Sequence, residues 1–145
     1  MIGYTLVLLK PDCLKRGLEE IILREIEALG FEVIATKRVR LTKKEVDIIW
    51  SSCKKESFYP DLIKFFTSGD SMVLLIKGEN AIERLTDFVG HWDPTKAKPY
   101  TIRHRYGISP MENVIHSSAT KEAFWKEAQL FFSKAELKQF LKNRR

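Results

Sequence analysis

The sequence predicts a sheet covered by helices, either an α/β or an α+β sandwich. Short apolar runs that fit strands alternate along the chain with longer segments whose apolar residues recur at helical spacing. The 145 residues are 44% hydrophobic and 30% charged, which is typical of a globular domain with a real core and not of a disordered chain. Packing a sheet against helices buries the apolar face of each. We therefore expect residues 1–145 to form a single domain.

Four segments have the pattern of strands. Residues 5–10 are a short run of Leu and Val that ends in a turn at Lys-Pro-Asp, and residues 31–39 alternate apolar and polar side chains. Residues 72–77 are a continuous apolar run that fits a central strand, and residues 114–116 form a short strand. The sequence therefore supplies enough strands for one small sheet.

Helices are indicated by periodicity and by start and stop signals. Thr42, with Glu45 three residues later, forms a capping box, and Gly30 and Gly90 follow helical segments as stops. The predicted helices are residues 14–29, 42–53, 60–67, 81–89, 120–132 and 134–142. Residues 91–111 contain three prolines and little periodicity, so they are expected to form a long ordered loop, which is usually functional. A ferredoxin-like split βαβ arrangement, of the α+β class, fits this order of elements best.

Composition narrows the class of protein. Cys13 and Cys53 are far apart and form no C-x-x-C pair, which argues against a zinc site or a disulfide framework and fits a reducing compartment. No apolar run approaches membrane-spanning length and no signal-peptide pattern is present, so we expect a cytoplasmic protein with no membrane partner. The net charge of +6 suggests an anionic partner, either nucleic acid or a small phosphorylated ligand. Part of the excess lies in an expected solvated C-terminal helix and tail, in Lys134, Lys138, Lys142, Arg144 and Arg145.

His116 is the most informative candidate residue. It follows an apolar strand segment and precedes Ser117-Ser118-Ala119-Thr120, where Ser or Thr can cap a helix, so it is expected near the positive end of that helix. A neutral imidazole can accept a phosphoryl group when one nitrogen is free and the other is fixed by an acceptor. Glu127, about two turns into the next helix, is a candidate for that acceptor. Taken alone, His116 fits better with a histidine that only satisfies the chain turn.

Three further residues could bind a phosphorylated ligand, and each has an ordinary alternative. Lys10 ends a strand before a proline, where it could offer a positive charge to phosphate or simply face water. Arg103, in Thr-Ile-Arg-His-Arg, could clasp phosphate oxygens or be a solvated loop residue. Phe58 could stack on a base or serve as a staple at a helix entry. Neither a Walker-type loop nor a G-x-G-x-x-G loop is present, and the three histidines lack metal-ligand spacing.

Five segments follow one another in a fixed order and spacing along the chain. They are Leu9-Lys10-Pro11-Asp12 with Arg16-Gly17, Gly30-Phe31, Phe58 with Leu62 and Ser68-Gly69, the loop from Gly90 to Arg103, and Asn113-Val-Ile-His116 with Ser118. Each alone is weak, but together they are specific, and over residues 5–132 the sequence resembles the nucleoside diphosphate kinase family.

This resemblance implies a fold, an activity and a set of site residues. The fold would be a ferredoxin-like antiparallel sheet covered by helices. The chemistry would be ping-pong: a nucleoside triphosphate phosphorylates the pros nitrogen of His116, which then passes the group to a nucleoside diphosphate. Magnesium would bridge the nucleotide phosphates without protein ligands, and the protein would be a hexamer, tetramer or dimer. The implied roles are support of the histidine by Ser118 and Glu127, phosphate and ribose binding by Lys10, Arg103 and Asn113, and base stacking by Phe58.

The sequence also departs from the family, which makes it an atypical member. An arginine of the family is Thr86 here, and Arg84 lies on the opposite helix face, so it is a poor substitute. A phosphate-binding threonine is Trp92, and Trp50 stands where the family usually has a tyrosine near the phosphates. Losing two donors could remove hydrogen bonds worth about 1.5–3 kcal/mol each, and His104 and Arg105 are candidates to replace the positive charge. The other departures are Tyr100, Ser117 and Ala119, each at a position where the family has Gly, Gly and Asp respectively.

Three functions remain in competition. The first is an active kinase with an atypical loop, in which Trp50, Thr86 and Trp92 join the nucleotide-binding set. The second is a nucleotide-binding or regulatory kinase-like module that keeps the histidine but has weak or no turnover. Nucleic-acid binding is disfavoured because the positive charge is spread along the chain and no interleaved aromatic pattern accompanies it.

Overall fold

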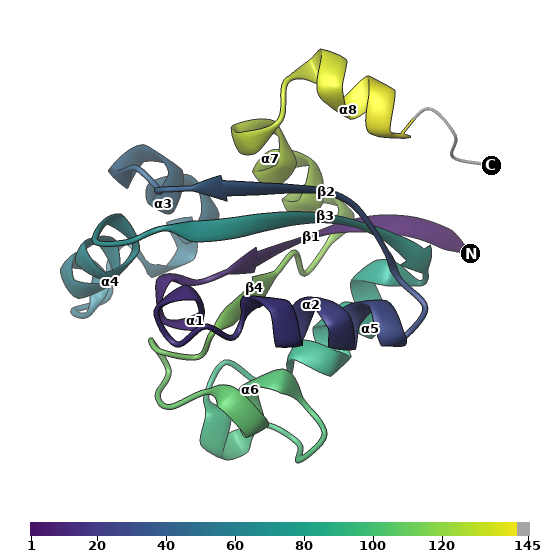
Figure 1. The fold of residues 1–145 in the computed structure, drawn as a ribbon. Helices are drawn as coiled ribbons and strands as arrows, with labels where there is room; N and C mark the ends of the chain where they lie inside the picture. Colours follow the sequence, from purple (N-terminus) through teal and green to yellow (C-terminus); the bar gives the residue numbers. More distant parts are fainter. Residues whose placement is uncertain (142–145) are drawn as a thin grey trace.

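The computed structural model describes residues 1–141, in which one four-stranded sheet carries helices on both faces (Figure 1). The sheet order is β2-β3-β1-β4 and every neighbouring pair is antiparallel. The predicted α+β, ferredoxin-like sheet is therefore confirmed. The strands are β1 (Ile2–Leu9), β2 (Glu32–Val39), β3 (Ser71–Glu79) and β4 (Ile115–Ser117). The basic tail from Lys142 onward, including the predicted end of the last helix, lies outside the described residues.

The helices follow the predicted order with three changes of boundary. They are α1 (Pro11–Lys15), α2 (Glu19–Ala28), α3 (Lys43–Ile49), α4 (Tyr59–Thr67), α5 (Ala81–Val89), α6 (Ile102–Tyr106), α7 (Lys121–Phe131) and α8 (Lys134–Leu141), with the 3-10 turns η1 (Ser51–Cys53) and η2 (Pro94–Lys96). No helix of residues 1–141 is long and apolar enough to cross a membrane.

The single helix predicted for residues 14–29 is wrong. Pro11 starts a helix directly after β1, since its ring fixes φ near the helical value and its missing N–H would have been unpaired there anyway. The chain then breaks at Gly17, whose φ of +67° is open to glycine at little cost, and α2 begins at Glu19. The expected turn at Lys-Pro-Asp is thus the start of α1, and Lys10 is its N-cap.

Two other boundaries differ from the prediction. The capping box of Thr42 and Glu45 is present, but α3 ends at Ile49 and the chain continues to Cys53 as η1. The expected loop of residues 91–111 contains η2 and α6, and α6 begins because Thr101 Oγ1 accepts a hydrogen bond from the backbone N–H of His104 at 3.2 Å. Arg103 therefore lies on a short helix and not on an irregular loop.

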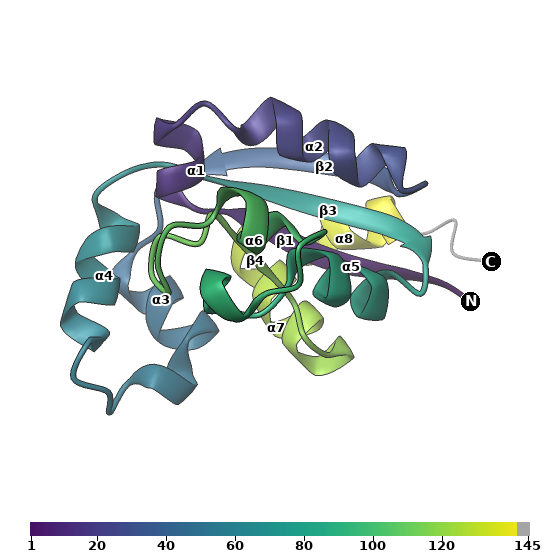
Figure 2. The same cartoon turned by 90° about the horizontal axis from the view of Figure 1, so that it is seen from below.

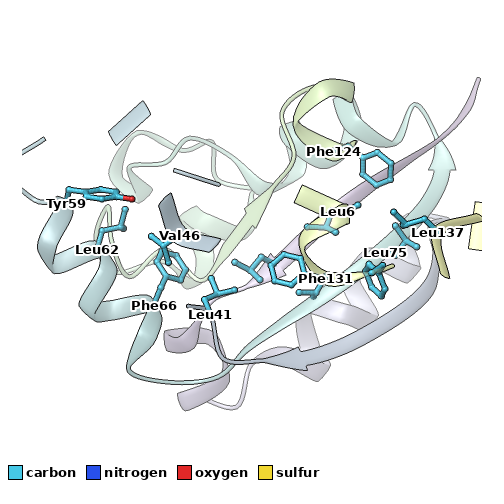
Figure 3. Close-up of a cluster of buried hydrophobic side chains, with 14 residues drawn as sticks. Leu6, Leu41, Val46, Tyr59, Leu62, Phe66, Leu75, Phe124, Phe131 and Leu137 are labelled. Atoms are coloured by element: carbon cyan, nitrogen blue, oxygen red, sulfur yellow. The ribbon is translucent and has the colours of Figure 1, made fainter. Parts of the chain in front are cut away.

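Strand β1 divides the core between the two faces of the sheet. Leu6 and Leu8 point to one face and Val7 and Leu9 to the other, and all four are fully buried. The first face packs against α3, α4, α7 and α8 (Figure 3), and the second, seen from below in Figure 2, packs against α1, α2, α5 and α6. With both faces covered, β1 and β3 are held firmly, and the residues that follow β1 are fixed with them.

Candidate active site

Two sheet strands bring the first candidate residues together. His116 lies on β4 opposite Leu8 of β1, and Lys10 follows the last residue of β1. The backbone N–H of Lys10 donates to the carbonyl of Val114 at 2.9 Å, which ties the end of β1 to the segment before β4. Residues 106 positions apart in the sequence are therefore neighbours because the two strands pair.

His116 is held by a carboxylate through one ring nitrogen. Its Nε2 lies 3.1 Å from Oε1 of Glu127, and the same oxygen accepts a 2.8 Å hydrogen bond from Oγ of Ser118. Glu127 is buried on α7, which Thr120 caps by accepting from the N–H of Ala123 at 3.0 Å. An ionised carboxylate only accepts hydrogen bonds, so the network assigns the hydrogen to Nε2 and leaves the Nδ1 lone pair free.

Lys10 is a buried cation that already touches another candidate. Its Nζ donates to Oδ1 of Asn113 at 2.6 Å and to the carbonyl of Met111 at 2.7 Å. Burial lowers the pKa of Lys10 to about 7; the nearby Asp12 opposes this and Arg103 adds to it. Nδ2 of Asn113 donates in turn to the carbonyl of Trp92 at 2.8 Å. The ammonium and the amide therefore form one linked donor set.

Arg103 reaches toward the same strand from α6. Its Nη1 donates to the carbonyl of Gly90 at 2.9 Å and its Nη2 to the carbonyl of Ile115 at 2.6 Å. Its Nε is buried and has no hydrogen-bond partner among the described residues. Desolvation lowers the pKa of this guanidinium to about 10, so it stays positively charged at neutral pH. Arg103 is thus fixed beside His116 with donor capacity left over.

Val114 has a strained backbone between Asn113 and the strand that carries His116. Its φ is +67°, a true outlier for a β-branched residue, and the N–H of Ile115 bonds back to the carbonyl of Asn113 at 2.9 Å, as in a γ-turn. Such strain persists only where the surroundings hold it, and it concentrates at functional sites.

Asp12 supplies that hold, and sequence reasoning assigned it no role. Its Oδ2 accepts a 3.1 Å hydrogen bond from the backbone N–H of Val114, 102 positions away in the sequence. Burial raises the pKa of the Asp12 carboxyl, an effect that Lys10 opposes. The sequence does contain a signal for this role. Asp12 directly follows Lys10 and Pro11 in the Lys-Pro-Asp motif, which places it on the first turn of α1.

Two aromatic candidates lie at the edge of this cluster. The Trp50 ring stacks on Phe66, with 4.2 Å between ring centroids, and contacts the ring of His116 at 5.1 Å. Phe58 is the N-cap residue of α4 and is 44% exposed, so its ring is open to solvent. Trp50 is therefore joined to the histidine, whereas Phe58 is available to a ligand from outside.

Comparison with known proteins identifies the family. The sequence model described as Nucleoside diphosphate kinase matches residues 3–137. The chain belongs to the nucleoside diphosphate kinase family. The curated nucleoside diphosphate kinases of Methanocaldococcus jannaschii and Saccharolobus solfataricus are 38% and 35% identical to it; each alignment covers 92% of this chain, and 95% and 96% of those proteins. The predicted family and enzyme class, a phosphotransferase acting on nucleotides, are confirmed.

Solved structures of the same family have the same fold. The Aquifex aeolicus nucleoside diphosphate kinase is 29% identical, with a TM-score of 0.86, over 94% of this chain and 99% of that one. The Halobacterium salinarum nucleoside diphosphate kinase, solved in complex with CDP, is 29% identical, with a TM-score of 0.88, over 94% of this chain and 91% of that one.

Two of the residues that depart from the family pattern lie on the surface. Thr86 is exposed on α5, and Trp92 is 57% exposed, so both face solvent. Arg84, as expected, is a poor substitute, because its guanidinium donates to the carbonyls of Leu29 and Glu79 and lies over the ring of Phe31. Arg84 therefore does not supply the positive charge that the family's arginine would carry at the position of Thr86.

The expectation that Arg105 supplies replacement charge is wrong. Its guanidinium forms a two-bond pair with the carboxylate of Glu25 on α2, at 3.1 and 2.5 Å, and Tyr106 donates to the same carboxylate at 2.7 Å. These contacts lower the pKa of Glu25, with the Arg105 hydrogen bond as the main cause, so the pair is charged at neutral pH. His104 is exposed, and one of its ring nitrogens, Nδ1, lies 3.1 Å from the carbonyl of Ala97.

The polar donors around His116 suit an anion. Within residues 1–141 there is no group of three or more His, Cys, Asp or Glu residues that could hold a metal ion. Glu127 contacts His116 itself, and the other polar side chains nearby include Lys10, Arg103 and Asn113, two basic groups and an amide that suit phosphate. Magnesium commonly keeps several waters and binds through substrate phosphates.

Proposed function

We propose that the protein transfers the γ-phosphate of a nucleoside triphosphate to a nucleoside diphosphate through a phosphohistidine at Nδ1 of His116. The observation that carries the proposal is the contact of Nε2 with Glu127, because it leaves Nδ1 as the unprotonated nucleophile. Ser118 supports the carboxylate by donating to the same oxygen. This arrangement is difficult to explain for a histidine that only satisfies a turn.

The proposed first half-reaction needs no proton transfer. The Nδ1 lone pair of His116 attacks the γ-phosphorus in line, an N–P bond forms, and the bond from that phosphorus to the bridging oxygen breaks. The electron pair leaves on this oxygen, which stays with the departing nucleoside diphosphate. The imidazole, still protonated at Nε2, gains positive charge that Glu127 offsets. In the second half-reaction a β-phosphate oxygen of the acceptor attacks the same phosphorus and the N–P bond breaks.

Phosphate binding falls to three residues in this proposal. Arg103 and the protonated form of Lys10 supply positive charge. Asn113, which Lys10 and the carbonyl of Trp92 orient, supplies a polar contact to phosphate or ribose. Positioning and charge neutralisation do most of the work in phosphoryl transfer, so a preformed donor set is the expected machinery. Bound to the nucleotide, magnesium would supply neutralisation of the phosphate charge.

The remaining contacts are also proposals. Phe58 would stack on the base with its open ring, and Thr86 and Trp92 would complete the nucleotide site. We further propose that residues 1–145 act as one kinase domain, that the protein assembles as a homo-oligomer, and that it works in the cytoplasm.

A labelling experiment tests the central claim. The protein is incubated with γ-labelled ATP and magnesium, and the expected product is an acid-labile, base-stable protein label that moves to added GDP. His116→Ala must abolish the label. The control is His91→Ala, at an exposed histidine in the loop after α5, and it must retain the label. Absence of label in the wild type, or label that persists in His116→Ala, contradicts the proposal.

A second candidate function is a kinase-like binding or regulatory module with weak turnover. The specific observation behind it is that Arg84 and Arg105 are both committed to protein partners, so the donors lost at Thr86 and Trp92 have no charged replacement there. The two functions differ in steady-state turnover and not in label formation. A phosphohistidine that forms but exchanges with GDP in minutes favours the module.

A further inference from the structure

Trp50 occupies an unusual position between the core and the histidine. It is the C-cap residue of α3, half-buried, and its backbone N–H donates to the carbonyl of Val46 at 2.9 Å. One side of its ring stacks on Phe66, with 25° between the ring planes. Phe66, labelled in Figure 3, is fully buried. The indole is therefore anchored on the core, and what it touches beyond the core is the ring of His116.

The contact with the histidine is ring against ring. The centroids of Trp50 and His116 lie 5.1 Å apart with 58° between the planes, within the range of favourable tilted aromatic pairs. The indole Nε1–H makes no hydrogen bond with any described residue, and no other described contact of Trp50 requires that donor. The ring surface, and not the N–H, is what the structure uses.

We infer that Trp50 is a positioning residue that holds the imidazole of His116 for phosphoryl transfer, and is not itself a phosphate ligand. This inference rests on the proposed phosphohistidine at His116. It goes beyond that proposal because it assigns the indole to the histidine and removes it from the nucleotide-binding set.

A positioning residue is needed because of how the histidine is held. The terminal torsion of a histidine side chain is broad, so one hydrogen bond from Nε2 to Glu127 leaves the ring free to swing about that bond. In-line attack by Nδ1 tolerates little misplacement, and an error near 1 Å can cost about 100-fold in rate. A rigid ring packed on the imidazole removes the remaining freedom, and Phe66 supplies the rigidity.

The same contact favours the phosphorylated form. When Nδ1 takes the phosphoryl group and Nε2 keeps its hydrogen, the imidazole becomes cationic. Tryptophan is the aromatic residue that attracts a neighbouring cation most strongly. Glu127 then faces the charged ring at one nitrogen while the Trp50 ring packs against it, and neither group has to move during the reaction.

Substitutions that separate ring from N–H test the inference. Trp50→Phe keeps an aromatic ring and removes the donor, Trp50→Ala removes both, and Trp125→Ala on α7 is the matched control, since Trp125 is 38% exposed and packs on Phe124. Rapid-quench labelling with ATP gives the maximal rate constant of phosphohistidine formation and the half-saturating ATP concentration for each variant.

The expected result is a fall in rate without a loss of affinity. Trp50→Ala lowers the maximal rate constant about 10-fold to 100-fold with the half-saturating concentration unchanged, and Trp50→Phe restores most of the rate. Equal rates in Trp50→Ala and wild type overturn the inference, as does a raised half-saturating concentration in Trp50→Phe, which would make the indole N–H a phosphate donor. If Trp50→Ala fails to fold, the half-saturating ATP concentration of Trp50→Phe decides: an unchanged value supports the inference and a raised value overturns it.

A spectroscopic measurement distinguishes positioning from a purely structural role. Trp50 touches the group that is phosphorylated, so its emission must change as the label appears, and Trp50→Phe must lose that part of the change while Trp125→Phe keeps it. An identical emission change in Trp50→Phe and wild type overturns the inference alone. A wild type that forms no phosphohistidine overturns the proposed function and this inference together.

Discussion

Replacing Lys10 by Met should remove phosphate binding and, with it, the pH dependence of stability that this buried lysine contributes. Lys10 is 4% exposed, and burial holds its pKa at about 7 against an ordinary value of 10.5. Between these two values the unfolded chain keeps its lysine proton while the folded protein has released it. Because the unfolded state binds more protons there, the stability of the wild type rises with pH across this window. Methionine has a similar length and no charge, so the variant lacks this dependence.

The size of the effect follows from the two pKa values. Each pKa unit is worth about 1.4 kcal/mol, so the wild type gains about 3 kcal/mol between about pH 6 and about pH 9.5 from Lys10 alone. The variant leaves Oδ1 of Asn113 and the carbonyl of Met111 without their donor, at about 1–3 kcal/mol each. That loss is common to both pH values, so it cancels when the two are compared.

Urea unfolding of both proteins at the two pH values measures this difference. The stability change caused by Lys10→Met should be more favourable at about pH 6 than at about pH 9.5 by about 3 kcal/mol. Lys126→Met, at an exposed position of α7, is the control and should show no such dependence. An equal effect of Lys10→Met at both pH values would refute the claim that burial drives the proton from Lys10. Labelling by ATP should be lost in Lys10→Met at either pH.

Three further changes probe the parts of the site that hold it in shape. Glu127→Gln keeps an acceptor near Nε2 of His116 but removes the charge, so phosphohistidine formation should slow about 100-fold with little change in ATP affinity, measured by rapid quench. Gly90→Ala should destabilise the fold by about 2 kcal/mol or more in urea, because φ is +94° and the new Cβ would lie 2.7 Å from a side-chain carbon; a change below about 0.5 kcal/mol would contradict this. Arg105→Ala breaks the two-bond pair with Glu25 and should cost about 1 kcal/mol at low salt and less in high salt, since this pair is partly exposed and screened.

The predicted elements that proved correct depend on local rules. The capping box at Thr42 needs only the residue three positions later, and the strand that becomes β1 needs only its apolar run. The break at Gly17 was missed because residues 14–29 keep helical spacing across it. The reason for the break appears only in the folded structure, where α1 starts at Pro11, immediately after β1, and ends before Gly17.

The site shows the same division between near and distant partners. The pairing of His116 with Glu127 could be predicted, since both belong to one strand–helix unit and helical spacing places the carboxylate over the strand. The left-handed backbone of Val114 could not be predicted, because it depends on Asp12, 102 positions earlier. Likewise no local pattern links Arg105 to Glu25, which are 80 positions apart.

The departures in the loop have a common consequence for Arg103. Tyr100 donates its hydroxyl to Asp87 on α5, and Arg105 clasps Glu25 on α2, so the segment around α6 is bound to both neighbouring helices. Tyr100 and Arg105 therefore fix the loop and do not add charge to the site. Arg103 is thus presented in a rigid frame, and its two Nη atoms are already engaged by backbone carbonyls. Any loss of turnover in this protein should consequently originate in the number of donors that reach the phosphates, at Thr86 and Trp92, and not in disorder of the loop that carries Arg103.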